Sequence, residues 1–539
     1  MNVIAVLSLL HEPAGRPGSA TRRFRGEAPL AWTLFRLGRC KRVAESIILC
    51  WEDQAVPARP IAEEMKARLW APRERIANVH LDGVAAARRW ADGWRGGLLG
   101  ACEFDRGFHG PSIAEIQNQT SCDAILLVDP SSSLVDCDLV DGLIEHAESY
   151  PDLDLCFSQA APGLSGVLLH KRLVEQLAPG GSHPGTLLSY RPDLPMRDAI
   201  STPSCAPVAT SIARSCHRFT LDSERQIERI SSATVHLNGQ LMSTEAEHLV
   251  RFMDAAPARF SLPREITLEL TTRRASKPIY SPLHSTKIER DDLSVQMAES
   301  IFREISAADD ARIIFGGIGD PLLHPEFAQI VESAQRAGIG AISVETDLLE
   351  IASGDIDQLA ELPIDIISVH LPAVSAQTYA AVMGVDGLGR VMANLTRLIH
   401  CRQARGRGTP LVTPTFIKTP ANFAEMDTWY DHWLRVLGCA VVGGPSDFAG
   451  QVTDVSLTQM QPPKRRSCVR IQQRLTILSD GSFATCEQDF LGRQSPGKVG
   501  EHSINKIWTG PMASLSREHS AGNFNCNGLC ANCKDWHRP

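Results

Sequence analysis

Short apolar runs recur through the first 230 residues, and polar segments with helical spacing separate them. The clearest runs are Asn2–Leu10, Ser46–Cys50 and Ala124–Val128. Nearly continuous apolar runs are typical of strands buried on both faces, and strands that alternate with helices favour a largely parallel sheet. The pattern therefore predicts an α/β domain over residues 1–230.

A second series of apolar runs begins after residue 261. Strands are expected at 266–270, 312–315, 341–345, 366–370 and 411–416, with a helix at about 294–305. Repeated strand-helix units predict a full or partial α/β barrel over residues 262–455, with its active face at the carboxyl ends of the strands. The weaker pattern of residues 231–261 is interpreted as a connector.

The pattern changes again after Pro462-Pro463. Apolar residues alternate on both sides of Asp480-Gly481, which predicts a hairpin over residues 475–486 that carries Cys486 at the end of its second strand. A helix is expected at about 504–517. We therefore assign residues 456–539 to a small C-terminal domain.

Composition and charge exclude several classes of protein. With 539 residues the chain is too long for one hydrophobic core. Its 54 Lys and Arg against 62 Asp and Glu give a net charge of −8, which argues against nucleic acid as a partner. No apolar run reaches the length that crosses a bilayer, and no basic segment precedes the first one, so we expect a cytoplasmic protein without a membrane span.

The C-terminal cysteines are the strongest chemical signal. The chain has 15 cysteines, of which those from Cys40 to Cys439 are scattered and are interpreted as small buried side chains. The others are clustered: Cys468, Cys486, Cys526, Cys530 and Cys533. Without a secretion signal, such a cluster favours metal over disulfides. Four thiolates from separate segments suit zinc or a fully ligated 4Fe-4S cluster, and their spacing does not choose between them.

The N-terminal region places Asp129 directly after a predicted buried strand, where a carboxylate can hold a divalent cation, and it carries several arginines in the loop 12–27. With Gly18-Ser19 and Phe219-Thr220-Leu221-Asp222, it resembles the nucleotidyltransferases that activate sugars, especially their cytidylyltransferase-like members. The resemblance implies Mg²⁺ at Asp129 and Asp222, and a nucleoside triphosphate or sugar nucleotide as partner. The lysine that this family carries in its first loop has no counterpart before Lys41.

The central region resembles the barrel of radical SAM enzymes that carry a SPASM domain. The resemblance rests on Leu270-Thr271-Thr272-Arg273, on the turn from Phe315 to Pro325, on Val344-Glu345-Thr346 and on Met383-Gly384-Val385-Asp386. In that family three cysteines hold a 4Fe-4S cluster whose open iron binds S-adenosylmethionine, but here Arg274, Pro278 and Ser281 stand in their positions. The resemblance implies that Gly316, Gly317, Gly319 and Asp320 are the remnant of an S-adenosylmethionine site, and it makes binding of that cofactor doubtful.

The C-terminal segment resembles the SPASM domain itself, through Cys468, the Ser479-Asp480-Gly481 turn, Cys486, Trp508, Cys530 and Cys533. This resemblance implies one 4Fe-4S cluster on Cys468, Cys486, Cys530 and Cys533, with Cys526 as an alternative ligand. The order of the three regions is similar to that of the spiro-SPASM protein family, in which a nucleotidyltransferase-like domain precedes a barrel without the radical SAM cysteines.

Three functional hypotheses follow. In the first, the chain is an iron-sulfur protein whose barrel is not catalytic, acting in surface-glycan or modification metabolism on a small molecule or a protein, with a redox partner. In the second, it is a Mg²⁺-dependent sugar-phosphate nucleotidyltransferase with a regulatory iron-sulfur module. In the third, it retains radical SAM chemistry. Whether the chain is an enzyme at all stays open at this point, as do its substrate and oligomeric state.

Overall fold

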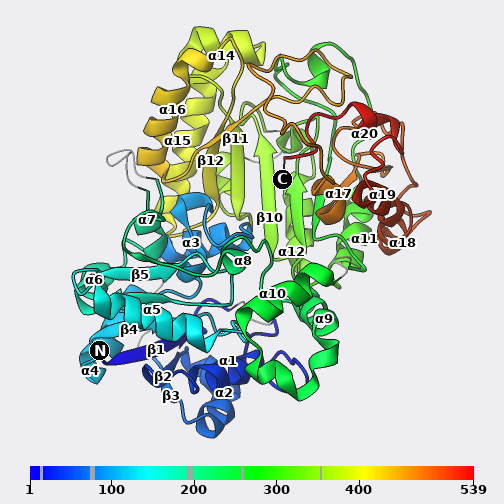
Figure 1. Cartoon of the computed structure of the whole chain (residues 1–539). Helices are drawn as coiled ribbons and strands as arrows, with labels where there is room; N and C mark the ends of the chain where they lie inside the picture. The colour runs from blue at the N-terminus through cyan, green and yellow to red at the C-terminus, as the bar shows by residue number, and fades with distance from the viewer. Residues whose placement is uncertain (13–15, 73–78, 191–197, 257–259, 352–354, 539) are drawn as a thin grey trace. The chain divides into compact units, whose positions relative to one another are not determined.

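The computed structural model describes residues 1–12, 16–72, 79–190, 198–256, 260–351 and 355–538. The chain forms two compact units, Met1–Ala258 and Arg259–Pro539. Each unit contains one large sheet with its own helices (Figure 1). The finer boundaries predicted at residues 230, 261 and 455 stay predictions.

The first unit is built on a seven-stranded sheet in the order β3-β2-β1-β4-β6-β5-β7. Its strands are β1 (Val3–Ser8), β2 (Val43–Leu49), β3 (Arg68–Trp70), β4 (Ala124–Leu127), β5 (Leu155–Ser158), β6 (Val167–His170) and β7 (Cys205–Ala206). The pairs β2–β3, β1–β2, β1–β4 and β5–β7 are parallel, whereas β6 runs antiparallel to β4 and β5. The predicted parallel core is confirmed, and β6 interrupts it.

Helices cover both faces of this sheet, as the apolar runs require. Along β1, Val3, Ala5 and Leu7 pack with α1 (Pro29–Leu37), α2 (Glu52–Glu64) and α5 (Cys137–Ser149), while Ile4 and Val6 pack on the other face with α3 (Val79–Arg89), α4 (Gly110–Thr120) and α6 (Lys171–Leu177). Two-sided burial of successive residues is the reason why β1 reads as an unbroken apolar run.

The remaining helices of the first unit are short or peripheral. They are η1 (Leu98–Gly100), η2 (Glu103–Asp105), α7 (Pro184–Leu188), α8 (Thr210–Ala213), α9 (Glu224–Ala233), η3 (Val235–Ser243) and α10 (Ala246–Ala255). The residues interpreted as a connector include α10, whose Leu249 and Val250 are buried in one cluster with Phe24 and Trp32. Residues 257–259 of that connector lie outside the described residues.

The second unit contains an eight-stranded sheet in the order β13-β12-β11-β10-β9-β8-β14-β15. Its strands are β8 (Glu265–Leu268), β9 (Arg312–Phe315), β10 (Ala341–Thr346), β11 (Ile366–His370), β12 (Leu411–Ile417), β13 (Val441–Gly443), β14 (Arg474–Ile477) and β15 (Phe483–Ala484). All neighbours pair in parallel except β14 and β15. The α/β prediction is confirmed, and the open strand order makes this a partial barrel.

The hairpin predicted in the C-terminal domain is present, and it has a second role that the pattern did not reveal. Its first strand, β14, pairs in parallel with β8, with Leu475 opposite Ile266. Gly481 has φ +82 in the turn, a conformation that favours glycine. The hairpin therefore extends the barrel sheet and covers the edge of β8.

Helices pack on one face of this sheet. They are α11 (Val295–Ile305), α12 (Phe327–Arg336), α13 (Ile356–Leu359), α14 (Ala376–Met383), α15 (Leu388–Ala404) and α16 (Met426–Leu437), and short turns lie at η4 (Pro282–His284), η5 (Pro321–Leu323) and η6 (Phe423–Glu425). The C-terminal segment adds α17 (Arg470–Gln473), α18 (Ile504–Thr509), α19 (Pro511–Ser520) and α20 (Gly528–Asn532). The single helix predicted at 504–517 is thus two helices that meet at Gly510.

The two faces of the second sheet differ in polarity. On β10, Ile342 and Val344 belong to the apolar core, whereas Ser343 and Glu345 alternate with them, and Glu345 is exposed to solvent. On β11, Ile367 and Val369 are core residues, while His370 is only half-buried. One face therefore holds the helices, and the other presents polar side chains to solvent.

No helix in the described ranges is both long enough and apolar enough to cross a bilayer.

Candidate iron-sulfur site and the positions that replace a second one

The C-terminal cysteines come from three separate elements of the second unit. Cys468 precedes α17, Cys486 follows β15, and Cys530 and Cys533 lie within and directly after α20. Cys468 and Cys530 are buried, Cys486 and Cys533 are half-buried, and Cys526 is exposed. The buried and half-buried four are those that the sequence assigned to a cluster.

Electrostatic coupling shows that these four thiols lie near one another. Burial raises the pKa of Cys486 far above its ordinary value, and the charges of Cys530, Cys468 and Cys533 raise it further. Burial also raises the pKa of Cys530 to about 12, again with contributions from Cys468 and Cys533. Cys526 also contributes to the shift of Cys530, but it is exposed, which places it at the margin of the group.

Hydrogen bonds and ion pairs hold the cysteine segment in place. Asn527 caps α20 by accepting a hydrogen bond from the backbone N–H of Leu529 at 2.9 Å. The guanidinium of Arg465 donates to the backbone oxygen of Cys530 and stacks on Phe524, 4.6 Å from the ring centre. Lys534 lies 2.9 Å from a carboxylate oxygen of Asp447.

This donor set fits a 4Fe-4S cluster. Among the described residues, no three His, Cys, Asp or Glu side chains gather around a point where one metal ion would sit. A four-iron cluster takes each thiolate on a different iron, so its ligands do not need to meet at one point. High thiol pKa values express the cost of burying thiolates without a metal, and a bound cluster would offset that cost.

The loop predicted to stand in place of the radical SAM cysteines holds an ion pair. Arg274, at the predicted first cysteine position, donates from Nε to Oδ2 of Asp347 at 2.9 Å and from Nη2 to Oδ1. The side chain of Arg274 is 8% exposed and that of Asp347 is 0% exposed. Burial alone would raise the pKa of Asp347, but Arg274 reverses this effect and lowers it. The first position is therefore filled by a fixed positive charge.

The other two positions are structural. Pro278 is buried, and its carbonyl accepts a hydrogen bond from the backbone N–H of Ser281 at 2.8 Å. Ser281 is buried and caps η4 by accepting from the backbone N–H of Leu283. None of the three residues carries a thiolate, so this loop does not fit the cluster that would bind S-adenosylmethionine.

Packing alone explains the glycines of the turn after β9. A Cβ on Gly316 would come within 2.9 Å of the Glu345 carboxylate, and one on Gly319 within 2.0 Å of the backbone oxygen of Thr271. Gly317 has φ +110. Asp320, the last residue of the predicted remnant site, accepts from Thr346 Oγ1 and from the backbone N–H of Asp347, both at 2.9 Å. It stays a prediction that Gly316, Gly317, Gly319 and Asp320 are only the remnant of an S-adenosylmethionine site.

Two titratable residues beside this turn were not singled out by sequence reasoning. Although the side chain of Glu345 reaches solvent, the protein around its carboxylate partly desolvates it and raises its pKa, and the charge of Glu487 adds to this shift. Burial lowers the pKa of His370 to about 4, with help from the Arg274 charge. The Nδ1 atom of His370 is buried without a hydrogen-bond partner. The signal available in the sequence was the alternation of polar and apolar residues along β10 and β11.

In the first unit, the two aspartates predicted to hold Mg²⁺ come together around an arginine. Nε of Arg106 lies 3.1 Å from Oδ2 of Asp129, and its Nη1 donates to Oδ2 of Asp222 at 2.6 Å. Arg218 also donates to Asp222. In the loop 12–27, Arg22 pairs with Glu224 at 2.9 Å and Arg25 donates to the backbone oxygen of Asn238 at 2.9 Å. Magnesium binding stays a prediction, and Arg106 was not foreseen.

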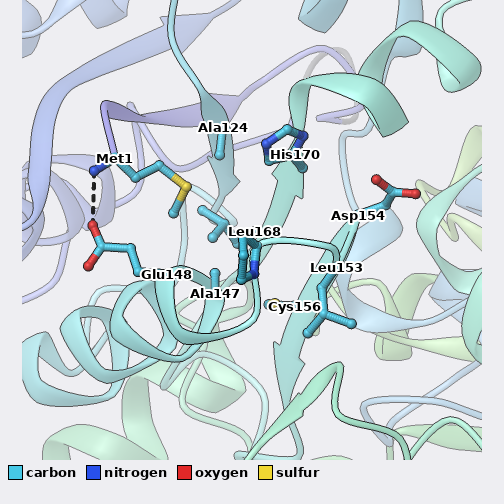
Figure 2. Close-up of a pocket in the computed structure, with 10 residues that line it drawn as sticks. Met1, Ala124, Ala147, Glu148, Leu153, Asp154, Cys156, Leu168 and His170 are labelled. Atoms are coloured by element: carbon cyan, nitrogen blue, oxygen red, sulfur yellow. Dashed lines mark hydrogen bonds and ion pairs between the residues drawn. The ribbon is translucent and has the colours of Figure 1, made fainter.

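A separate pocket of about 240 Å³ lies at the opposite edge of the first sheet (Figure 2). Ala124, at the start of β4, lines it together with Cys156 and Leu168, and the N-terminal amine reaches Glu148 at 2.9 Å beside it. Ligands of parallel α/β sheets bind beyond the carboxyl ends of the strands. This pocket is therefore not a candidate for the chemistry predicted at Asp129.

Comparison with known proteins agrees with the C-terminal assignment. Residues 468–534 match the SPASM family, described as an iron-sulfur cluster-binding domain. The matched segment includes all four predicted ligands, although the match assigns none of them individually.

Curated relatives match part of the chain. The chain is 22% identical over 139 residues, which is 26% of its length and 39% of the relative's, to the tungsten-containing aldehyde ferredoxin oxidoreductase cofactor-modifying protein of Pyrococcus furiosus. It thus spans about two fifths or less of the curated relatives it matches.

Two solved structures are more distant. One is Streptococcus suis SuiB bound to S-adenosylmethionine, with 14% identity, TM-score 0.39, and coverage of 61% of this chain and 87% of that one. The other is a cytidylyltransferase from Leptospira borgpetersenii, with 13% identity, TM-score 0.33, and coverage of 47% and 92%. The comparisons thus show a SPASM-like, iron-sulfur cluster-binding segment at residues 468–534, in a chain that is similar over part of its length to proteins of the radical SAM/SPASM type.

Proposed function

We propose that this protein binds one 4Fe-4S cluster through Cys468, Cys486, Cys530 and Cys533, and that its barrel works without cleaving S-adenosylmethionine. The observation that supports the proposal is the buried pair of Arg274 and Asp347, since Arg274 is the residue predicted at the position of the first cluster ligand. A cluster ligated by four thiolates has no open iron for S-adenosylmethionine. When bound, it can supply structure or electron transfer.

The polar face of the barrel sheet supports a binding role for this unit. Glu345 is exposed to solvent there, Ser368 and Thr415 share a hydrogen bond of 2.8 Å, and His370 keeps an unpartnered ring nitrogen. Such a surface suits a polar small molecule or a peptide. We propose that this role belongs to surface-glycan or modification metabolism, with a redox partner that serves the cluster, in the cytoplasm.

Metal analysis tests the proposal directly. Anaerobically purified protein should contain about four irons and four sulfides per chain and no stoichiometric zinc, and it should give the electron paramagnetic resonance signal of one cluster after reduction. Incubation with S-adenosylmethionine and a strong reductant should yield no methionine above the background. About eight irons per chain, stoichiometric zinc in place of iron, or reductive cleavage of S-adenosylmethionine would each refute it.

Single-residue variants test the ligand set. Cys486→Ser should lose the cluster, whereas Cys526→Ser, the matched control from the exposed margin of the group, should retain it. Equal loss in both variants would place Cys526 among the ligands.

A further inference from the structure

The carboxyl ends of β1 and β4 form the natural crevice of the first sheet. β1 pairs with β2 on one side and with β4 on the other, so strands that come later in the chain lie on both sides of it. Doubly wound sheets bind their ligands at such a point. A cavity of about 20 Å³ lies here, lined among others by Ser8, Glu103, Arg106, Asp129 and Ser165. A space of this size holds about one water molecule or one small ion.

Arg106 is the cation at the centre of this crevice. Its guanidinium contacts Asp129 at 3.1 Å and Asp222 at 2.6 Å, and these carboxylates are only 15% and 17% exposed. Burial by itself would lower the pKa of Arg106, but Asp129, Asp222 and Glu103 reverse this and raise it. Two aspartates fixed this close repel each other unless a positive charge lies between them, and Arg106 supplies that charge.

Two further polar atoms face the cavity without partners. Glu103 is 8% exposed; its Oε1 accepts from the backbone N–H of Gly163 at 3.1 Å, while its Oε2 has no hydrogen-bond partner. Ser165 is 5% exposed, and its Oγ has no partner either. Buried oxygens without partners are uncommon and call for a partner such as a water molecule or an ion. Carboxylate and hydroxyl oxygens are the donors that Mg²⁺ and Mn²⁺ prefer, but with Arg106 in place no three acidic side chains among the described residues converge on a point where a metal ion could sit.

We propose that Arg106 is a built-in cation that takes the place of a divalent metal ion between Asp129 and Asp222, so that this site binds Mg²⁺ or Mn²⁺ only when the guanidinium is removed. The first unit thus holds a latent metal site that its own side chain fills. The inference is independent of the iron-sulfur cluster and of the barrel.

Equilibrium dialysis of the full-length holo-protein against Mn²⁺ tests this proposal. The wild type and Asp129→Asn should bind the same amount of Mn²⁺, because the wild-type site is already occupied. Arg106→Ala should gain about one Mn²⁺ per chain, with at least about tenfold tighter binding than any wild-type site, and Arg106→Ala/Asp129→Asn should lose it again.

Arg218→Ala is the matched control. It removes the other guanidinium on Asp222 but leaves Arg106 between the two aspartates, so it should gain no Mn²⁺. If Arg106→Ala does not fold, Arg106→Gln keeps a hydrogen-bond donor without the charge, and Mn²⁺ should raise its melting temperature but not that of the wild type.

Two results would overturn the proposal. One is a Mn²⁺ site in the wild type that Asp129→Asn abolishes. This result can be obtained even if no Arg106 variant folds. The other is a folded Arg106→Ala or Arg106→Gln that binds no more Mn²⁺ than the wild type. A gain of Mn²⁺ in Arg218→Ala equal to that in Arg106→Ala would likewise show that Arg106 is not the specific occupant.

Discussion

Two segments of the second unit differ in how their charged groups are neutralised. The loop of residues 274–281 is closed by the chain itself, because Arg274 and Asp347 neutralise each other in a buried pair. In the cysteine segment, burial opposes the ionisation of Cys486, Cys530 and Cys533, so we expect this segment to need a bound metal to be complete. The comparison teaches that one site should be indifferent to metal, whereas the other should depend on it for stability.

In the first unit, as in the loop of residues 274–281, an arginine neutralises mostly buried carboxylates. Arg106 lies between Asp129 and Asp222 just as Arg274 lies against Asp347, with carboxylates that are mostly buried in both cases. A guanidinium is a permanent cation with several donors, so it can satisfy both oxygens of a carboxylate or two carboxylates at once. Arginine is therefore the side chain best suited to replace a metal ion in such a place.

The largest expected effect comes from breaking the cysteine segment. Cys530→Ser should lose essentially all iron and lower the free energy of unfolding by on the order of 5 kcal/mol or more, because binding of a structural metal is folding free energy. Iron analysis and anaerobic urea unfolding measure both effects. A variant that keeps its stability after losing its iron would show that the cluster is not structural.

An intermediate effect is expected from breaking the arginine pair. Asp347→Ala should cost about 3–5 kcal/mol in urea unfolding, since it leaves the buried charge of Arg274 without a partner. The iron content should not change, because the pair lies outside the cysteine segment.

The double variant Arg274→Met/Asp347→Leu is the matched control for this effect. Well-packed apolar side chains can replace a buried ion pair at little cost, so the double variant should recover most of the lost stability. If the single and double variants are equally unstable, the charge of Arg274 is not what makes the single change costly.

The smallest effect concerns His370, which shares its surroundings with Arg274. Its folded pKa is lowered to about 4 from 6.5, first by burial and then by Arg274. As the pH falls below 6.5, His370 becomes protonated in the unfolded chain but stays neutral in the folded chain. The free energy of unfolding therefore decreases progressively towards pH 4. Between pH 7.5 and 5.5 the wild type should lose about 1 kcal/mol more than His370→Gln, which cannot titrate.

Urea unfolding of both proteins at the two pH values measures this difference. Arg274→Met/Asp347→Leu should leave most of this difference in place, because burial is the largest cause of the shift. The double change removes both the Arg274 charge, which lowers the pKa of His370, and the Asp347 charge, which raises it. Equal pH dependence in the wild type and His370→Gln would mean that His370 is already solvated in the folded state.

The strand pattern determined most of the fold. β1, β4, β9, β10, β11 and β12 all lie at or within a few residues of the predicted positions, because each is a short apolar run buried by helices. The SPASM segment was also readable from sequence, since a polar segment rich in cysteine has few roles other than metal binding. The absence of thiols at Arg274, Pro278 and Ser281 was readable in the same way, and their assignment to the radical SAM cysteine positions stays a prediction.

Only the tertiary structure decided which remote side chains and strands pair with one another. Arg106 lies 116 residues from Asp222, and Arg274 lies 73 residues from Asp347, and neither pair shows any local periodicity. The pairing of β14 with β8 was hidden for the same reason, because its partner lies more than two hundred residues earlier. Charge pairs and sheet edges depend on distances between remote segments, and these are set by the packing of the core rather than by any neighbouring residue. The sequence thus showed which residue types stand at each predicted site, and the folded chain showed which remote charges pair there.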